Sequence, residues 1–251
     1  MFAHRPVPDS SRSDSVDALR GLAMVWMTVF HFCFDLSHFG LWPQDFLADP
    51  FWTHQRTAIV SLFLLCAGLG QALALDAGLG WPRFWRRWRR VVGAALLVSA
   101  GSYLMFPHSF IYFGVLHGMA VMLVAARLTA GGGRWLWPAG AVAIALPWAA
   151  AALLAGSAAE PWFNARGLNW LGLVTRKPFT EDYVPVFPWL GVMWWGLALG
   201  QWLLARHRAW LAAALPAPGR ALAVLGRWSL VYYLLHQPVM IGALALWRAL
   251  P

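Results

Sequence analysis

Arg20-Gly-Leu-Ala-Met-Val-Trp-Met-Thr-Val-Phe-His31 is an apolar stretch bounded by two ionisable residues. No residue between Arg20 and His31 is charged, which is typical of a membrane-spanning helix. His31 follows Arg20 by eleven positions. At about 1.5 Å per residue it therefore lies roughly 16 Å deeper, near the middle of a bilayer. Asp35 follows one helical turn later on the same face. Ionisable groups are costly at this depth, so the stretch predicts a functional site in the membrane.

The composition of the whole chain agrees with a membrane protein. Of its 251 residues, 60% are hydrophobic and 12% are charged, whereas about a quarter of a soluble domain is charged. The long apolar runs lack the short alternating segments of a barrel, so they predict an all-α polytopic helical bundle. The net charge of +9 could indicate nucleic-acid binding. However, most basic residues lie at the ends of predicted helices, so we expect a bilayer and no nucleic acid as partner.

Apolar segments predict about seven transmembrane helices, or eight if residues 156–185 contain another span. The seven cover approximately residues 16–39, 54–75, 81–106, 109–128, 136–154, 186–205 and 221–246. Residues 1–15 are polar and are predicted to form a disordered cytoplasmic tail, and residues 16–250 a single transmembrane domain. Fourteen of the 19 lysines and arginines fall on the side of the N-terminus in this arrangement. The positive-inside rule therefore predicts a cytoplasmic N-terminus.

Four polar side chains are predicted to lie at membrane depth, namely His31, Asp35, His117 and His236. Each histidine taken alone could be a structural residue bonded to a neighbouring helix, but several together favour a polar cavity. His31 and Asp35 are spaced to form a hydrogen bond that fixes the histidine tautomer and makes His31 a general base. A metal site formed by His31, Asp35 and His38 is the alternative. We expect no metal, because no dense cluster of histidine and cysteine supports it.

A second cluster lies in residues 81–90, where five arginines fall within eight positions. One interpretation is an anchor that binds lipid phosphates at the membrane surface. The other is a site for a phosphate-bearing cofactor, because arginine binds phosphate oxygens in pairs. The sequence contains no Walker-type P-loop, GxGxxG or GxSxG motif, so it does not support nucleotide hydrolysis or serine hydrolase chemistry of the soluble type.

Four motifs in order give the chain a resemblance to a known family. The motifs are Asp17-Ala-Leu-Arg20-Gly-Leu-Ala with His31, Asp35-Leu and Phe39-Gly40 after it; Tyr112-Phe-Gly-Val-Leu-His117; Val184-Pro-Val-Phe-Pro-Trp-Leu-Gly191; and Gly226-Arg-Trp-Ser-Leu-Val-Tyr-Tyr-Leu-Leu-His-Gln-Pro238. With these motifs the chain resembles bacterial proteins of the heparan-α-glucosaminide N-acetyltransferase catalytic-domain family over about residues 13–240.

The resemblance implies an acyltransferase of the bacterial inner membrane. Type-three members of the wider group carry an Arg-x10-His motif and an Arg-x-x-Arg pair, to which Arg20 with His31 and Arg87 with Arg90 are similar. The implied donor is acetyl-CoA, and the implied acceptor is an amine or hydroxyl of a glycan or other small envelope molecule. Arg87, Arg90 and Arg20 would bind CoA. His31, Asp35, His117 and His236 would form the catalytic group, with His54 as a competing position for the base.

Two other functions are compatible with the same residues. A proton-coupled transporter could use the histidines as a proton relay, and a non-catalytic membrane scaffold could use them to join helices. The sequence makes no prediction of the oligomeric state.

Overall fold

The computed structural model describes residues 13–250, and the regular structure there is helical. The elements are α1 (Asp14–His38), α2 (Pro50–Asp76), α3 (Trp81–Met105), α4 (Val115–Leu128), η1 (Ala130–Trp135), α5 (Leu136–Leu154), α6 (Glu160–Asn164), η2 (Asn169–Leu171), α7 (Val186–Arg206), α8 (Arg208–Leu211), α9 (Ala217–Arg227) and α10 (Ser229–Ala249). The all-α prediction is confirmed. Residues 1–12 of the predicted tail lie outside the described part, and α1 begins two residues before the expected start at residue 16.

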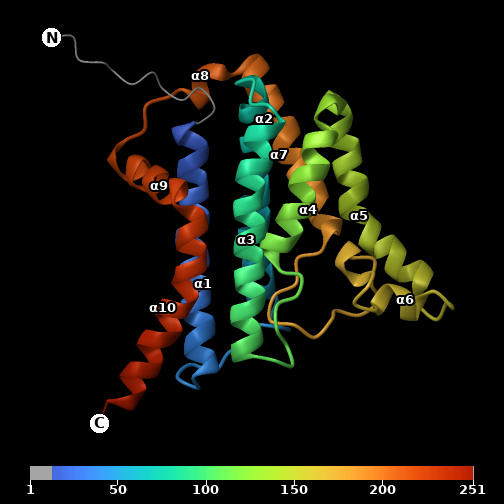
Figure 1. The fold of residues 1–251 in the computed structure, drawn as a ribbon, viewed down its shortest axis with the longest axis vertical. Helices are drawn as coiled ribbons and strands as arrows, with labels where there is room; N and C mark the ends of the chain where they lie inside the picture. The colour runs from blue at the N-terminus through green and yellow to red at the C-terminus, as the bar shows by residue number, and fades with distance from the viewer. Residues whose placement is uncertain (1–12, 251) are drawn as a thin grey trace.

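The long helices run alternately along the bundle (Figure 1). α1, α3 and α10 run in one direction, and α2, α4 and α7 run in the other. The starts of α1 and α3 and the end of α4 therefore lie at one end of the bundle, and the C-terminus lies at the other (Figure 1). Within residues 13–250, four helices are long and apolar enough to cross a membrane: α1, α2, α10 and the segment Ala130–Leu154. The total of about seven spans and the direction of insertion stay predictions.

The last predicted helix is not continuous, which corrects the expected span over 221–246. α9 ends at Arg227 and α10 begins at Ser229, with Trp228 between them at φ −96° and ψ 11°. α9 packs across α1, whereas α10 continues along the bundle beside α1 (Figure 1). Apolar residues continue through both helices, so the sequence pattern does not reveal where the chain changes direction. That change depends on the packing of α9 against α1.

The segment before α4 and the loop after α5 also differ from the prediction. α4 begins at Val115, six residues after the expected start, because Phe113 pairs with Tyr183 as an isolated bridge. Within 156–185, where the sequence left an eighth span open, the structure has the short helices α6 and η2. Side-chain hydrogen bonds hold this loop in place of a longer helix. One of them joins the Asn169 amide, as donor, to the Tyr112 hydroxyl at 2.9 Å.

Close contact between α2 and α7 forms the centre of the bundle. A Cβ atom on Gly68 would overlap the carbonyl oxygen of Met193, and one on Gly196 would overlap that of Leu65. Small residues at such positions let two helix backbones approach closely, as is common between membrane helices. The buried side chains of Leu64, Met193 and Leu197 pack beside this contact.

Replacing Gly196 by alanine is expected to lower the free energy of unfolding by roughly 1–3 kcal/mol, because the methyl group forces α2 and α7 apart. The measurement is thermal denaturation in detergent. Gly101→Ala is the matched control, since a Cβ atom on Gly101 of α3 meets nothing within 4 Å. Equal melting temperatures for the two variants would contradict the role assigned to this contact.

Candidate functional site

A cavity of about 500 Å³ lies among the helices that meet at the end of the bundle where α1 starts. α1, α2, α3, α4 and the junction of α9 with α10 all contribute to its wall. Its most unusual feature is the number of guanidinium groups. Six arginines line it: Arg20, Arg83, Arg87, Arg90, Arg127 and Arg227.

Helical spacing decides which arginines of α3 face this cavity. Arg83, Arg87 and Arg90 are separated by four and three residues, so they share one face of the helix. The cavity is lined by these three, whereas the exposed side chains of Arg86 and Arg89 are absent from its lining. The structure thus places the predicted residues Arg20, Arg87 and Arg90 in one site and divides the arginine cluster into two faces.

Arg83, Arg127 and Arg227 are additional residues of this site. The spacing of Arg83 from Arg87 could have revealed it from the sequence. Arg127 and Arg227 belong to distant segments, and no sequence pattern relates them to α3. Arg127 is held by the carbonyl oxygen of Leu79 and lies 5.5 Å above the ring of Trp81.

The cavity changes from charged to apolar with depth. Arg20 is near the start of α1, and Met24, one turn further along the helix, also lines the cavity. Other apolar lining side chains are Phe63, Val115, Leu116, Met119, Leu123 and Leu230. A ligand with an anionic head and a less polar tail therefore complements the cavity.

Tyr233 connects the cavity with a pair of histidines on α1 and α10. Tyr233 lines the cavity, and its ring centre is 5.6 Å from that of His236. Nδ1 of His31 and Nε2 of His236 are 2.7 Å apart, and the two rings are stacked with centres 5.0 Å apart. His236 is 8% exposed. The structure thus brings together two of the predicted histidines from opposite ends of the sequence.

The bonds of this pair determine where the hydrogens lie when both rings are neutral. The carbonyl oxygen of Tyr233 is 2.7 Å from Nδ1 of His236. A carbonyl can only accept, so Nδ1 of His236 donates and its Nε2 is the acceptor. Nδ1 of His31 must then donate to His236, which leaves Nε2 of His31 with a free lone pair. The chain of bonds thus leaves the basic nitrogen of the pair on His31.

Asp35 has a different partner from the one predicted. The structure pairs the Asp35 carboxyl with Gln237, whose Nε2 donates to Oδ1 at 2.6 Å, and pairs His31 with His236 instead. Asp35 is 1% exposed, and its Oδ2 has no hydrogen-bond partner among the described residues. These two polar pairs lie one turn apart between α1 and α10, and a hydrogen bond of 2.6 Å between the hydroxyls of Thr28 and Tyr232 also joins the two helices. The i, i+4 spacing on α1 could not reveal partners that come from α10.

His117 lies in a separate group of hydrogen bonds. Its Nδ1 accepts a hydrogen bond from the backbone N–H of Gly114 at 3.3 Å, and its Nε2 lies 3.0 Å from the Ser99 hydroxyl. Both ring nitrogens are thus engaged, and they join the start of α4 to α3. The two other histidines considered from the sequence, His38 and His54, have exposed side chains. Among residues 13–250, no group of three or more His, Cys, Asp or Glu side chains is arranged to hold a metal ion.

The loop between α5 and α7 supports the cavity from the far end of α4. Oδ2 of Asp182 accepts a hydrogen bond from the backbone N–H of Val115 at 2.8 Å, which caps the helix. Burial raises the pKa of the Asp182 carboxyl, and this hydrogen bond acts in the opposite direction. Val115 and the adjacent Leu116 line the cavity, so Asp182 and His117 together fix the part of α4 that forms its deeper wall.

An all-helical bundle with membrane-type helices surrounds the arginine-lined cavity and the histidine pair beside it, which is the architecture of an integral membrane protein. The family model for the heparan-alpha-glucosaminide N-acetyltransferase catalytic domain matches residues 12–238. The chain therefore belongs to this family, as its motifs predicted, and membership implies a membrane acetyltransferase. Comparison with curated proteins and with solved structures gives no match.

Proposed function

We propose that the protein transfers an acetyl group from acetyl-CoA to an amine or hydroxyl of a sugar or other small envelope molecule. The observation that carries the proposal is the continuity between two sites. The arginine-lined cavity is in contact, through Tyr233, with the pair formed by His31 and His236. Family membership supports acetyl transfer, and these two sites supply places for an anionic donor and for a base.

The cavity suits CoA because its charged and apolar parts match those of the molecule. Arg87, Arg90 and Arg20 bind the phosphates, since guanidinium groups form paired, charge-assisted hydrogen bonds with phosphate oxygens. The apolar wall accommodates the arm that carries the thioester. His31 lies roughly 16 Å from Arg20 along α1, so the arm must extend past Met24 and Tyr233 for the thioester to reach it.

The acid–base chemistry follows from the free lone pair on His31. Nε2 of His31 takes the proton from the acceptor as its nitrogen or oxygen attacks the thioester carbonyl. The new bond to the acetyl carbon forms, the carbon–sulfur bond breaks, and His31 returns the proton to the departing thiolate. His236 shares the positive charge through its hydrogen bond to His31, and Asp35, one turn away, stabilises that charge. His117 holds the cavity wall rather than moving a proton.

We further propose that the donor binds on the cytoplasmic side of a bacterial inner membrane. The arginines of the cavity lie at the end of the bundle that the positive-inside rule assigns to the cytoplasm. The acceptor then approaches from the opposite end, where the loops over 40–53 and 156–185 lie. This arrangement lets a cytoplasmic donor modify an acceptor on the other side without itself crossing the membrane.

The test is incubation of membranes containing the protein with acetyl-CoA labelled in the acetyl group, followed by identification of the labelled product. The expected result is a labelled small molecule or glycan that is absent when the protein carries His31→Ala. Solute or proton flux in proteoliposomes without any acetylated product would instead support a transporter. The absence of both product and flux, with no stabilisation of the protein by CoA, would support a scaffold.

A further inference from the structure

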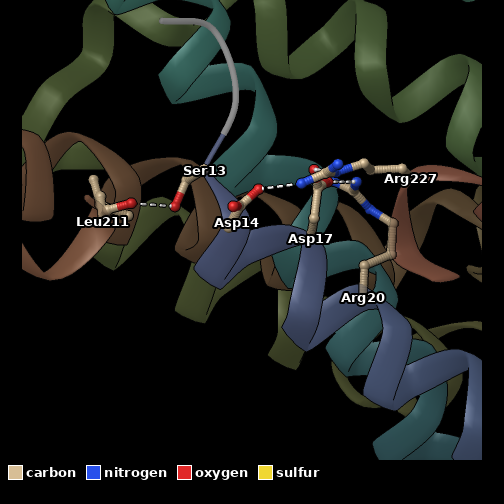
Figure 2. Close-up of polar contacts among 6 residues, drawn as sticks. All are labelled: Ser13, Asp14, Asp17, Arg20, Leu211 and Arg227. Carbon is tan, nitrogen blue, oxygen red and sulfur yellow. Dashed lines mark hydrogen bonds and ion pairs between the residues drawn. The ribbon is translucent and has the colours of Figure 1, made fainter. Parts of the chain in front are cut away.

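One acidic residue lies among the arginines of the cavity. Asp17 of α1 is 4% exposed, and it is the one carboxylate among the described residues that line the cavity. Oδ1 of Asp17 accepts a hydrogen bond from Nη1 of Arg20 at 2.7 Å, and Oδ2 lies 3.8 Å from Nε of Arg227 (Figure 2). A buried acid that contacts two cationic residues of a proposed anion site requires an explanation, because it opposes the charge of the ligand.

The packing of α9 on α1 places Arg227 beside this acid. A Cβ atom on Gly226 would overlap the carbonyl oxygen of Asp17, and one on Gly21 would overlap that of Leu222. The two backbones therefore touch at both glycines, and Arg227 follows Gly226 directly. The start of α1 is also held from α8, since the Ser13 hydroxyl donates to the carbonyl oxygen of Leu211 at 2.6 Å (Figure 2).

Within residues 13–250, the contacts of Arg20 and Arg227 with acidic residues leave other N–H donors of both guanidinium groups free. Each guanidinium has five N–H donors in a rigid plane. Arg20 uses Nη1 toward Asp17, and Arg227 directs Nε toward Asp17 and Nη2 toward Asp14 at 2.6 Å. These contacts fix the orientation of each guanidinium group, and the remaining N–H groups can still donate to a ligand. Long arginine side chains otherwise lose rotamer freedom when they bind a ligand, so fixing them in advance reduces the cost of binding.

We propose that Asp17 is a positioning residue, which holds the guanidinium groups of Arg20 and Arg227 in the orientation that receives the phosphates of the acyl donor. This inference rests on the proposed function. Asp17 also reduces the mutual repulsion of the six arginines before the donor binds. Asp17 acts through the arginines and contacts no reacting atom.

Asp14 provides a matched control within the same cluster. It also forms an ion pair with Arg227 from α1, but its side chain is 56% exposed and it does not line the cavity. Asp14→Asn and Asp17→Asn therefore remove the same charge, one turn apart, from the same helix. The two variants differ in burial and in the contact with Arg20.

The experiment compares acetyl-CoA with S-acetylpantetheine, which carries the same thioester but no phosphate. In Asp17→Asn, the KM for acetyl-CoA and the Kd for CoA are expected to rise by about tenfold, the order expected when one charge-assisted contact is disturbed. The kcat at saturating acetyl-CoA and the kcat/KM for S-acetylpantetheine are expected to stay within about twofold of wild type. Asp14→Asn removes a contact of Arg227 alone, through an exposed ion pair that contributes little, so its KM for acetyl-CoA is expected to rise by no more than about twofold.

Three outcomes would overturn the inference: a Kd for CoA in Asp17→Asn equal to or lower than that of wild type, an equal loss with both donors, or an equal effect of Asp14→Asn. If Asp17→Asn does not fold, Asp17→Glu takes its place. Glu keeps the charge but moves the carboxylate, so a smaller rise of the KM for acetyl-CoA is expected, and an unchanged KM overturns the inference. A wild-type protein that neither binds CoA nor uses acetyl-CoA would refute the proposed function itself.

Discussion

Replacing His31 by alanine is expected to lower kcat for acetyl transfer by about 10²- to 10⁴-fold, the contribution typical of a general base. The reason is the bonding of the pair, which leaves the free lone pair on Nε2 of His31. The KM for acetyl-CoA is expected to change little, because the cavity arginines are untouched. The measurement is steady-state kinetics of the purified protein with saturating acceptor.

His38→Ala is the control for this prediction, since His38 lies on the same helix with an exposed side chain. It is expected to keep the wild-type rate. His236→Ala is expected to lower kcat less than His31→Ala, because His236 shares the charge but does not take the proton from the acceptor. A His31→Ala protein that folds and turns over normally would contradict the assignment of the base.

Arg87→Ala combined with Arg90→Ala is expected to raise the KM for acetyl-CoA by about 100-fold or more, since each charge-assisted hydrogen bond lost costs about tenfold. The kcat at saturation is expected to fall much less than the KM rises, because the histidine pair is intact. The Kd for CoA, measured by calorimetry at two salt concentrations, gives the same information without turnover. The loss is expected to be smaller at high salt, where phosphate contacts are screened.

The double variant Arg86→Ala with Arg89→Ala is the matched control. These residues carry the same charge on the same two turns of α3, but they do not line the cavity. The control is expected to bind CoA as the wild type does. Equal losses of CoA affinity in the two double variants would show that the cluster acts only as a charged surface toward the membrane.

The sequence was sufficient to predict the helical class and the family, and three arginines that it singled out, Arg20, Arg87 and Arg90, line one cavity in the structure. Apolar runs interrupted by short charged clusters leave few alternatives to a membrane bundle. Helical spacing places Arg87 and Arg90 on one face of α3, and the Arg20 end of α1 is at the same end of the bundle. Arg127 and Arg227 also line the cavity because of how α4 and α9 pack, and no local sequence pattern predicts that packing.

Of the four residues predicted to form one polar group, the structure brings His31, Asp35 and His236 together on α1 and α10, whereas His117 bonds separately to Ser99 and Gly114. His31 and Asp35 share a face of α1, so local spacing favoured a bond between them. The structure instead pairs both with consecutive residues of α10, His236 and Gln237. Long-range pairing of this kind depends on the register of two helices separated by about 200 positions. The break at Trp228, which sets the course of α10, was also not predictable from the apolar pattern.

The most direct test of the central claim is an experimental structure of the protein with CoA bound. The account predicts that the phosphates of CoA lie among Arg20, Arg87 and Arg90. It also predicts that the thiol points past Tyr233 toward His31. CoA bound at the other end of the bundle, or bound in the cavity with its thiol directed away from the histidine pair, would contradict the account.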